Sequence, residues 1–355
     1  MLKAALRGGV ERYRLFRNRK RMMELESNNM NKLKLEKLTD IEWAEVCDKW
    51  QKLSVLNILP KYYQMFKTLD HFDSDFVSDD VFMPFILRSL NDEKESRSFE
   101  HKGMYDIIFN DLIKRPKTII NCINGTYYSA DGHVVTRGKL LDSLKCAEEC
   151  IVKPTKGSCM GRNVKKLSLP DKSIMDDLSS YGENFIIQQI VKQSPLTASF
   201  NASSLNTFRI STLNINGRVS LCTILFRCGQ AGASVDNGAA GGLMVGVYED
   251  GHFRDFAYDN KYNRYYETKR GVKFSDVFIS NMSNIVEDIK SIHRKCLPNM
   301  GFAGWDIALD EDNCPVMIEV NLSWPGIQFE QLCPGQPIFG DRSSEVIEYV
   351  LRKKH

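Results

Sequence analysis

Two carboxylates and one amide near the C-terminal end of the sequence are residue types that bind magnesium. Asp306, Glu319 and Asn321 fall within the stretch Gly304–Gly326, in two short apolar segments rather than in the polar turn between them. Carboxylate and amide oxygens are hard ligands that suit Mg²⁺ carried by a nucleotide. The alternative is that the acids are simply solvated on the wet face of a hairpin, which is the commoner role of such residues.

A pair of strands has to position these residues. Polar residues Asp310–Asn313 separate two segments with alternating apolar residues, so we predict a hairpin with a four-residue loop. In that register Asp306 faces Met317 and is a diagonal neighbour of Glu319, about 7–8 Å away at the backbone. The other face is then expected to pack on a core through Ile307, Leu309, Val316, Ile318 and Val320.

A lysine followed by a glycine-containing loop predicts a place for phosphate. Lys153 is near the end of an apolar strand segment, the loop contains Gly157 and Gly161, and a second strand segment, Val164–Leu167, follows. Glycines let backbone N–H groups approach an anion closely, and the lysine supplies a point charge. The spacing is not that of a Walker loop, and an ordinary turn beside a surface lysine is the alternative.

Composition limits the class of protein. The chain has 355 residues, 43% of them hydrophobic, which is enough for two or three globular lobes. Its net charge is +3. Residues 1–37 hold eleven Lys/Arg and four Asp/Glu, so the remainder is mildly acidic. This distribution argues against nucleic acid as a partner, because the basic surface should then lie on the folded domain. Ten cysteines without a CxxC pair indicate reduced thiols and a cytoplasmic protein.

Three regions follow from the order of the patterns. Residues 1–95 are expected to be a mostly helical unit, which begins with the basic leader 1–37 and contains a capping box at Thr39–Glu42. Short strands and loops then predict one lobe over 96–187 and a second over 188–355. The leader has apolar residues at helical spacing, so we expect either a solvated helix or a helix that lies on the inner face of an anionic membrane. No apolar run reaches membrane-spanning length.

The order of the motifs resembles that of the ATP-grasp superfamily. Glu100-His101-Lys102 comes first, followed by Lys153 with its glycine loop, and the strand end Gln188–Val191. Arg209 within a strand, then Asp306 and Glu319-x-Asn321, complete the series. The sequence is most similar to the sugar-transfer-associated ATP-grasp proteins, through HKGMYDIIFNDLIKRPKTI, SSLNTFRIST, SVDNGAAGG and WPGIQFEQLCPGQPIFGD. The resemblance implies an α+β fold of two lobes that clasp a nucleotide, preceded by the helical unit.

The resemblance also implies a role for each motif residue. The nucleotide phosphates are expected to contact Lys102, Lys153 and Arg209, under a mobile lid that contains Gly157, Ser158 and Gly161. The adenine is expected at Gln188, Gln189, Ile190 and Val191. Mg²⁺ is expected at Asp306, Glu319 and Asn321.

One departure from the superfamily concerns the cation beside the substrate. Gly304 and Trp305 stand where several ATP-grasp ligases have an arginine before the metal-binding aspartate. We therefore expect Arg227 to supply that charge, and to act in catalysis with Arg209 and Lys153.

The reaction that the resemblance implies is ATP-dependent ligation. A substrate carboxylate, on a small molecule or a sugar or surface-polysaccharide precursor, would form an acyl phosphate, and an amine would then displace phosphate. A kinase that phosphorylates a sugar or polyol hydroxyl is an alternative. A non-catalytic ATP-binding accessory protein of glycan assembly is another. The sequence does not indicate an oligomeric state.

Overall fold

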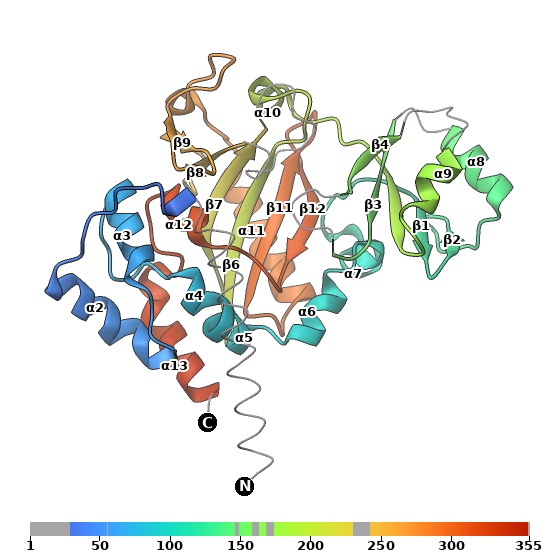
Figure 1. Ribbon diagram of the computed structural model, residues 1–355. Coiled ribbons are helices and arrows are strands. Elements are labelled where there is room, and N and C mark those ends of the chain that lie inside the picture. Colours follow the sequence, from blue (N-terminus) through green and yellow to red (C-terminus); the bar gives the residue numbers. More distant parts are fainter. Residues whose placement is uncertain are drawn as a thin grey trace, which may run out of the picture.

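The protein consists of a helical unit and two antiparallel sheets, as the computed structural model shows (Figure 1). The structure describes residues 29–54, 56–145, 149–157, 163–167, 174–229 and 242–353. The basic leader lies almost entirely outside this part, so its contact with a membrane stays a prediction. None of the helices in the described ranges is long and apolar enough to span a bilayer. The predicted α+β class, with helices before the sheets, is confirmed.

The helical unit starts at a capped helix. Helix α2 (Asp40–Trp50) has Thr39 as its N-cap, whose hydroxyl accepts from the Glu42 N–H at 3.2 Å. The Glu42 carboxylate in turn accepts from the Thr39 N–H at 2.7 Å, so the predicted capping box is confirmed. The chain continues through η1 (Gln51–Leu53), α3 (Pro60–Leu69), α4 (Asp79–Val81), the π-helical η2 (Phe82–Ile86), α5 (Leu87–Leu90) and α6 (Glu93–Phe99).

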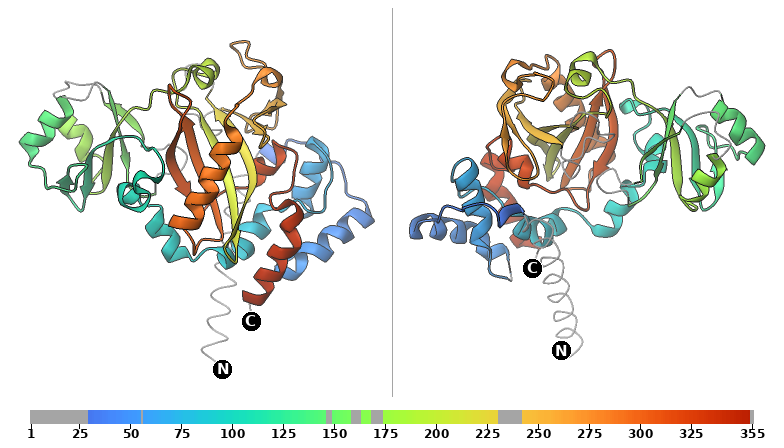
Figure 2. Two further views of the ribbon diagram at one scale, coloured as in Figure 1. Left: turned by 180° about the vertical axis from the view of Figure 1, so that it is seen from behind. Right: turned by 45° about the horizontal axis from the view of Figure 1, so that its top comes forward.

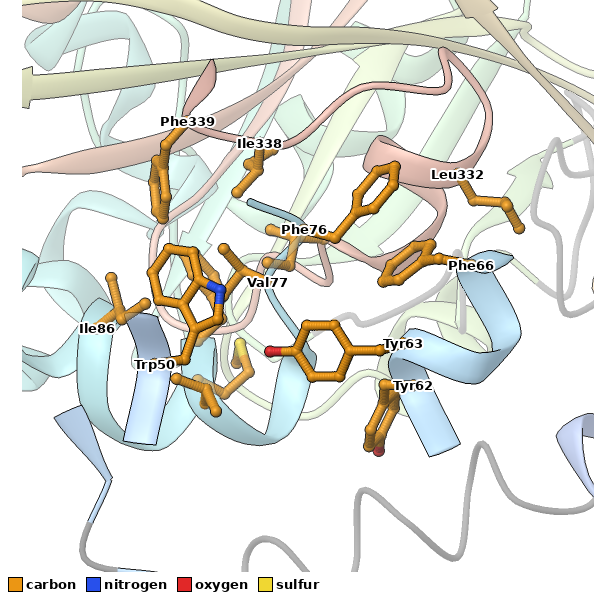
Figure 3. Packing of buried hydrophobic residues seen from close by; sticks show 14 of the residues in the cluster. Trp50, Tyr62, Tyr63, Phe66, Phe76, Val77, Ile86, Leu332, Ile338 and Phe339 are labelled. Carbon is orange, nitrogen blue, oxygen red and sulfur yellow. The ribbon is translucent and has the colours of Figure 1, made fainter. Parts of the chain in front are cut away.

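The C-terminal segment completes the core of the helical unit. Aromatic residues of α2 and α3 pack against α12 (Gln328–Leu332) and the residues after it, as Figure 3 shows for Trp50, Phe66, Leu332 and Phe339. The rings of Phe66 and Phe76 stack with their centroids 4.4 Å apart. The chain then ends in η7 (Gly340–Arg342) and α13 (Ser343–Lys353), which belong to the same core.

The first sheet has five strands in the order β2-β1-β5-β3-β4. Its strands are β1 (Thr118–Ile123), β2 (Thr126–Tyr128), β3 (Cys150–Pro154), β4 (Lys165–Leu167) and β5 (Phe185–Gln189). The short elements η3 (Lys102–Met104), α7 (Tyr105–Ile108) and η4 (Asn110–Leu112) lead into it. Helices α8 (Arg137–Lys145) and α9 (Ile174–Ser179) pack on it around a small core of their own. The predicted strand–loop–strand around Lys153 is the antiparallel pair β3–β4.

The second sheet has seven strands in the order β10-β9-β8-β7-β6-β11-β12. These are β6 (Thr207–Ile215), β7 (Arg218–Cys228), β8 (Leu243–Val247), β9 (Phe253–Tyr258), β10 (Arg264–Tyr265), β11 (Phe302–Leu309) and β12 (Pro315–Asn321). Helix α10 (Pro195–Phe200) precedes the sheet, and η6 (Phe274–Asp276) follows β10. Asn216 and Gly217 turn β6 into β7 with φ of +54° and +80°, as a tight hairpin requires.

The two faces of the seven-stranded sheet are covered differently. Helix α11 (Met282–Cys296) lies across one face, with Ile285, Ile289 and Ile292 buried against the strands (Figure 2). On the other face, Leu213 and Leu225 pack into the core of the helical unit. The same face also carries the polar residues described below, so the helical unit borders the site directly.

The predicted register of the final hairpin is wrong by two residues at Asp306. Leu309 lies opposite Pro315 rather than Cys314, so the strands are already shifted by one residue next to the turn, which moves Met317 to the core face. A β-bulge at Ile318 adds the second residue, so Asp306 lies directly opposite Glu319 and the predicted faces of Glu319 and Val320 are restored. The core face therefore contains Met317 rather than Val316 and Ile318, together with the expected Ile307, Leu309 and Val320.

Candidate functional site

An acidic pair lies on the polar face of the seven-stranded sheet, on the two strands at one edge. Asp306 on β11 and Glu319 on β12 are cross-strand partners, so both side chains leave the sheet on the same side. Asn321 lies two residues further along β12, and its amide donates to the Asp306 carboxylate at 3.3 Å. The structure thus brings together the three predicted metal ligands. They are oxygen donors of the kind that binds Mg²⁺.

Two arginines neutralise Asp306. Arg209, opposite Asp306 on β6, donates from Nε to one carboxylate oxygen at 2.6 Å and from Nη2 to the other at 3.2 Å. Arg227 on β7 lies 2.9 Å from the same carboxylate. Burial raises the pKa of Asp306, but the two guanidinium groups outweigh this and hold the pKa at about 2. Asp306 is therefore ionised at any physiological pH.

Gly304 explains how Arg209 fits against the neighbouring strand. A side chain at position 304 would place its Cβ 3.2 Å from Cδ and 3.4 Å from Nη1 of Arg209. The first contact is tighter than ordinary van der Waals contact, and the second is at its lower limit. The glycine thus leaves room for Arg209 to lie across β11 and reach Asp306.

The segment around Lys102 joins the two sheets. The Lys102 ammonium lies 2.5 Å from the Glu319 carboxylate, and its backbone N–H donates to the carbonyl of Thr155, just after β3, at 2.9 Å. Two residues earlier, the Glu100 carboxylate accepts from the N–H groups of Leu322 and Ser323 at 2.6 and 2.7 Å. One short stretch therefore holds the end of β3 in place against the end of β12.

Lys153 is a buried cation without a counter-ion among the described residues. Only 4% of it is exposed, and none of the described groups pairs with its ammonium. Burial lowers its pKa to about 8, the charge of Lys102 acts in the same direction, and the charge of Glu319 opposes them. Lys153 on the five-stranded sheet is thus close enough to Lys102 and Glu319 to respond to their charges.

Buried polar atoms around this junction also lack partners in the described part of the chain. They are Nδ1 of His101, Oδ1 of Asn121 and Oγ1 of Thr155. The side-chain nitrogen of Asn121 does have a partner, since it donates to the Gly103 carbonyl at 2.7 Å. Burial, followed by the charge of Lys156, lowers the pKa of His101. Unpaired buried donors and acceptors are costly, so they indicate a place where a polar ligand binds.

The strand end predicted to hold adenine leads out of the five-stranded sheet. Gln189 is the last residue of β5, and its N–H donates to the Lys117 carbonyl at 2.9 Å. The N–H of Ile190 donates to the Glu149 carbonyl at 3.3 Å, and Val191 follows. The Gln188 amide donates to the Pro116 carbonyl at 3.2 Å, while its oxygen has no partner among the described residues. Their contact with adenine stays a prediction.

The predicted phosphate lid is described only at its first glycine. Gly157 has a φ of +69°, a left-handed conformation that glycine adopts without strain. Ser158 and Gly161 lie outside the described residues.

One charged residue of the site was not predicted from the sequence. Glu330 on α12 is 2% exposed, and its carboxylate lies 3.3 Å from Nη1 of Arg209. Its other oxygen accepts from the hydroxyl of Ser211, which lies two residues after Arg209 on β6. No pattern around Glu330 indicates this role, because half of the residues in the stretch IQFEQL are polar.

Three solved structures to which this chain is similar are ligases or synthetases by their descriptions. The D-alanyl-alanine synthetase A from Vibrio cholerae O1 biovar eltor is 13% identical, with a match over 72% of this chain and 65% of the synthetase and a TM-score of 0.44. The VanG D-Ala:D-Ser ligase from Enterococcus faecalis is 11% identical, over 75% and 64%, with a TM-score of 0.43. The ATP-grasp ligase PsnB, complexed with minimal precursor, is also 11% identical, over 74% and 62%, with a TM-score of 0.43.

This chain therefore spans less than two thirds of the length of these three proteins. No curated protein matches the sequence. Residues 84–346, more than half of the chain, match the family described as sugar-transfer associated ATP-grasp. The protein belongs to this sugar-transfer associated ATP-grasp family, as the order of its motifs predicted.

Proposed function

We propose that this protein is an ATP- and Mg²⁺-dependent carboxylate–amine ligase that modifies a sugar or surface-polysaccharide precursor. The observation that carries the proposal is Lys153, a buried cation without a counter-ion among the described residues, whose pKa responds to the charges of Lys102 and of Glu319 on the other sheet. A protein that keeps an unpaired buried charge bears a cost in stability. A bound polyphosphate would remove that cost.

The residues present fit both a nucleotide and a metal ion. Lys153, Lys102 and Arg209 would contact the phosphates, and the oxygens of Asp306, Glu319 and Asn321 would hold Mg²⁺. When bound, the metal neutralises phosphate charge and orients the phosphates. The acids are now paired with Arg209, Arg227 and Lys102. These cations would become available to the phosphates when the acids bind metal.

The proposed reaction balances without a covalent intermediate on the protein. A carboxylate oxygen attacks the terminal phosphorus of ATP, and ADP leaves. The amine nitrogen then attacks the acyl carbon, phosphate leaves, and the nitrogen gives up a proton to complete the amide. Arg209 would stabilise charge on the terminal phosphate, and Arg227 charge on the substrate side. The remaining task of the chain is to align the reactants.

Mass spectrometry of products tests the proposal. The purified protein is incubated with Mg²⁺, ATP and extracted metabolites that include carboxylates and amines. An amide product, with phosphate release that requires the amine, is expected. A phosphorylated hydroxyl compound would instead assign a kinase, and tight binding of Mg-ATP without turnover of a broad acceptor panel would assign an accessory protein.

Matched variants locate the site. Lys153→Ala and Glu319→Ala should each abolish ATP turnover while the chain remains folded. Lys290→Ala is the control, because Lys290 forms a surface ion pair with Glu287 on α11, on the opposite face of the sheet. Near-normal turnover in the Lys153→Ala/Glu319→Ala double variant would refute the assignment.

A further inference from the structure

Glu330 is a buried carboxylate beside the site that the proposed reaction does not use. Both of its oxygens are engaged, one with the Arg209 guanidinium at 3.3 Å and the other with the Ser211 hydroxyl. Glu330 and Asp306 contact different nitrogens of Arg209, so the guanidinium is held from two sides. A planar group held by two carboxylates has a fixed orientation.

A buried ion pair is weak evidence for a role in stability. Removing two charges from water is costly, and a well-packed apolar pair is often at least as stable. The presence of a carboxylate there is better explained by what it does to Arg209.

The element that carries Glu330 is anchored outside the site. Just before α12, the N–H of Ile327 donates to the Asp79 carboxylate at 3.1 Å. The Gln331 side chain donates to the Val77 carbonyl at 2.8 Å and accepts from the Val77 N–H at 2.9 Å. Residues of the helical unit therefore fix the helix from which Glu330 reaches Arg209.

The two carboxylates around Arg209 differ in what else they can do. Asp306 is next to Glu319 and Asn321 and is the expected metal ligand. If Asp306 bound a metal ion, its hold on Arg209 would weaken. Glu330 lies on the other side of the guanidinium and keeps its contact, supported by Ser211.

We propose that Glu330 is a positioning residue that holds Arg209 toward the terminal phosphate of the nucleotide after Asp306 has engaged the metal. This inference rests on the proposed function. It assigns the helical unit a part in the site, because that unit anchors α12. It predicts that Glu330 affects binding of a triphosphate but not of a diphosphate.

A double-mutant cycle tests the inference without a known acceptor. The full chain is prepared as wild type, Glu330→Gln, Arg209→Lys and the double variant. Titration calorimetry measures the affinity of each for Mg-ADP and for Mg²⁺ with a non-hydrolysable ATP analogue. Glu330→Gln should weaken binding of the triphosphate about tenfold, the loss expected for a hydrogen bond to a charged group. The affinity for Mg-ADP should change less than about twofold, well below that loss.

The cycle also shows whether Glu330 acts through Arg209. Lysine keeps the charge of Arg209 but not its planar fork, so Arg209→Lys should produce the same selective loss. When Arg209 is already lysine, Glu330→Gln should cause almost no further loss of triphosphate affinity. Glu42→Gln is the matched control, since it removes a glutamate–lysine ion pair with Lys67 at 2.9 Å within the helical unit, away from the site.

Three outcomes would overturn the inference. They are equal losses for both nucleotides, full additivity in the double variant, or unchanged triphosphate affinity in folded Glu330→Gln. If Glu330→Gln does not fold, Glu330→Asp replaces it, and the same selective loss is expected. Failure of the wild-type chain to bind either nucleotide would overturn the proposed function itself, and this inference with it.

Discussion

On the seven-stranded sheet, each site arginine lies against a carboxylate: Arg209 against Asp306 and Glu330, and Arg227 against Asp306. On the five-stranded sheet, Lys153 is just as deeply buried but has no counter-ion among the described residues. The pKa values differ accordingly. Asp306 is held at about 2 by its arginines, whereas the pKa of Lys153 falls to about 8.

The contrast separates two functions of buried charge. The pairs on the larger sheet hold the site in shape before any ligand arrives, since each charge is compensated within the sheet. The lysine on the smaller sheet has no ion-pair partner among the described residues, so an anion that reaches it gains a strong attraction. Removing a charge should therefore destabilise the folded protein on one sheet and stabilise it on the other.

The largest effect is expected for Asp306→Ala. This change leaves Arg209 with Glu330 alone and Arg227 without its carboxylate. Breaking a buried pair from one side typically costs about 3–5 kcal/mol of the free energy of unfolding. Urea unfolding of the variant and the wild type measures the difference. A loss below about 1 kcal/mol would mean that the pairs do not hold the larger sheet in shape.

Lys153→Met should instead increase the free energy of unfolding at pH 7 by about 1–3 kcal/mol. Below pH 8 the wild-type lysine is charged in both states, and its burial destabilises the folded state. Between pH 8 and its ordinary pKa of 10.5 the unfolded state binds more protons, so wild-type stability rises and the advantage of the variant shrinks. Urea unfolding at several pH values measures this trend.

Lys52→Met is the control for this series, since Lys52 is exposed on η1. It should show no advantage that depends on pH in this way. A Lys153→Met variant that is less stable than the wild type at pH 7 would contradict the contrast between the sheets.

A smaller loss is expected for Glu319→Gln. Lys102, whose side chain is 5% exposed, would lose its ion pair, but Glu319 itself is 23% exposed and partly solvated. We expect the free energy of unfolding to fall by about 1–2 kcal/mol. Thermal unfolding of the variant measures it. An increase in stability would instead mean that Glu319, like Lys153, costs the folded protein stability and is retained for binding a ligand.

The smallest effect is expected for Thr39→Ala, far from both sheets. Loss of the N-cap of α2 should cost about 1 kcal/mol of unfolding free energy. The affinity for Mg-ADP should stay as in the wild type, which calorimetry measures. A marked change in affinity would show that the first helix influences the site as strongly as α12 does.

Local patterns were sufficient for much of this fold. The capping box at Thr39 and the β3–β4 pair around Lys153 depend on neighbours in sequence, and both are present. The placement of Asp306 and Glu319 on one face also follows from simple alternation along strands.

The bulge at Ile318 was not predictable, because the residues around it are apolar and suit either face. Glu330 was missed because its partner Arg209 is 121 residues away in sequence. Lys153 was found as a cation, but its burial was not, since a lysine near a strand end suggests an exposed side chain. Each of these features depends on packing between distant segments, which single-sequence patterns do not contain.

A crystal structure with Mn²⁺ and a non-hydrolysable ATP analogue tests the central claim most directly, since anomalous scattering locates the metal. We predict a metal peak bound by Asp306 and Glu319, with the phosphates in contact with Lys153. A metal bound elsewhere, or a Lys153 ammonium that contacts no phosphate in the complex, would contradict the account.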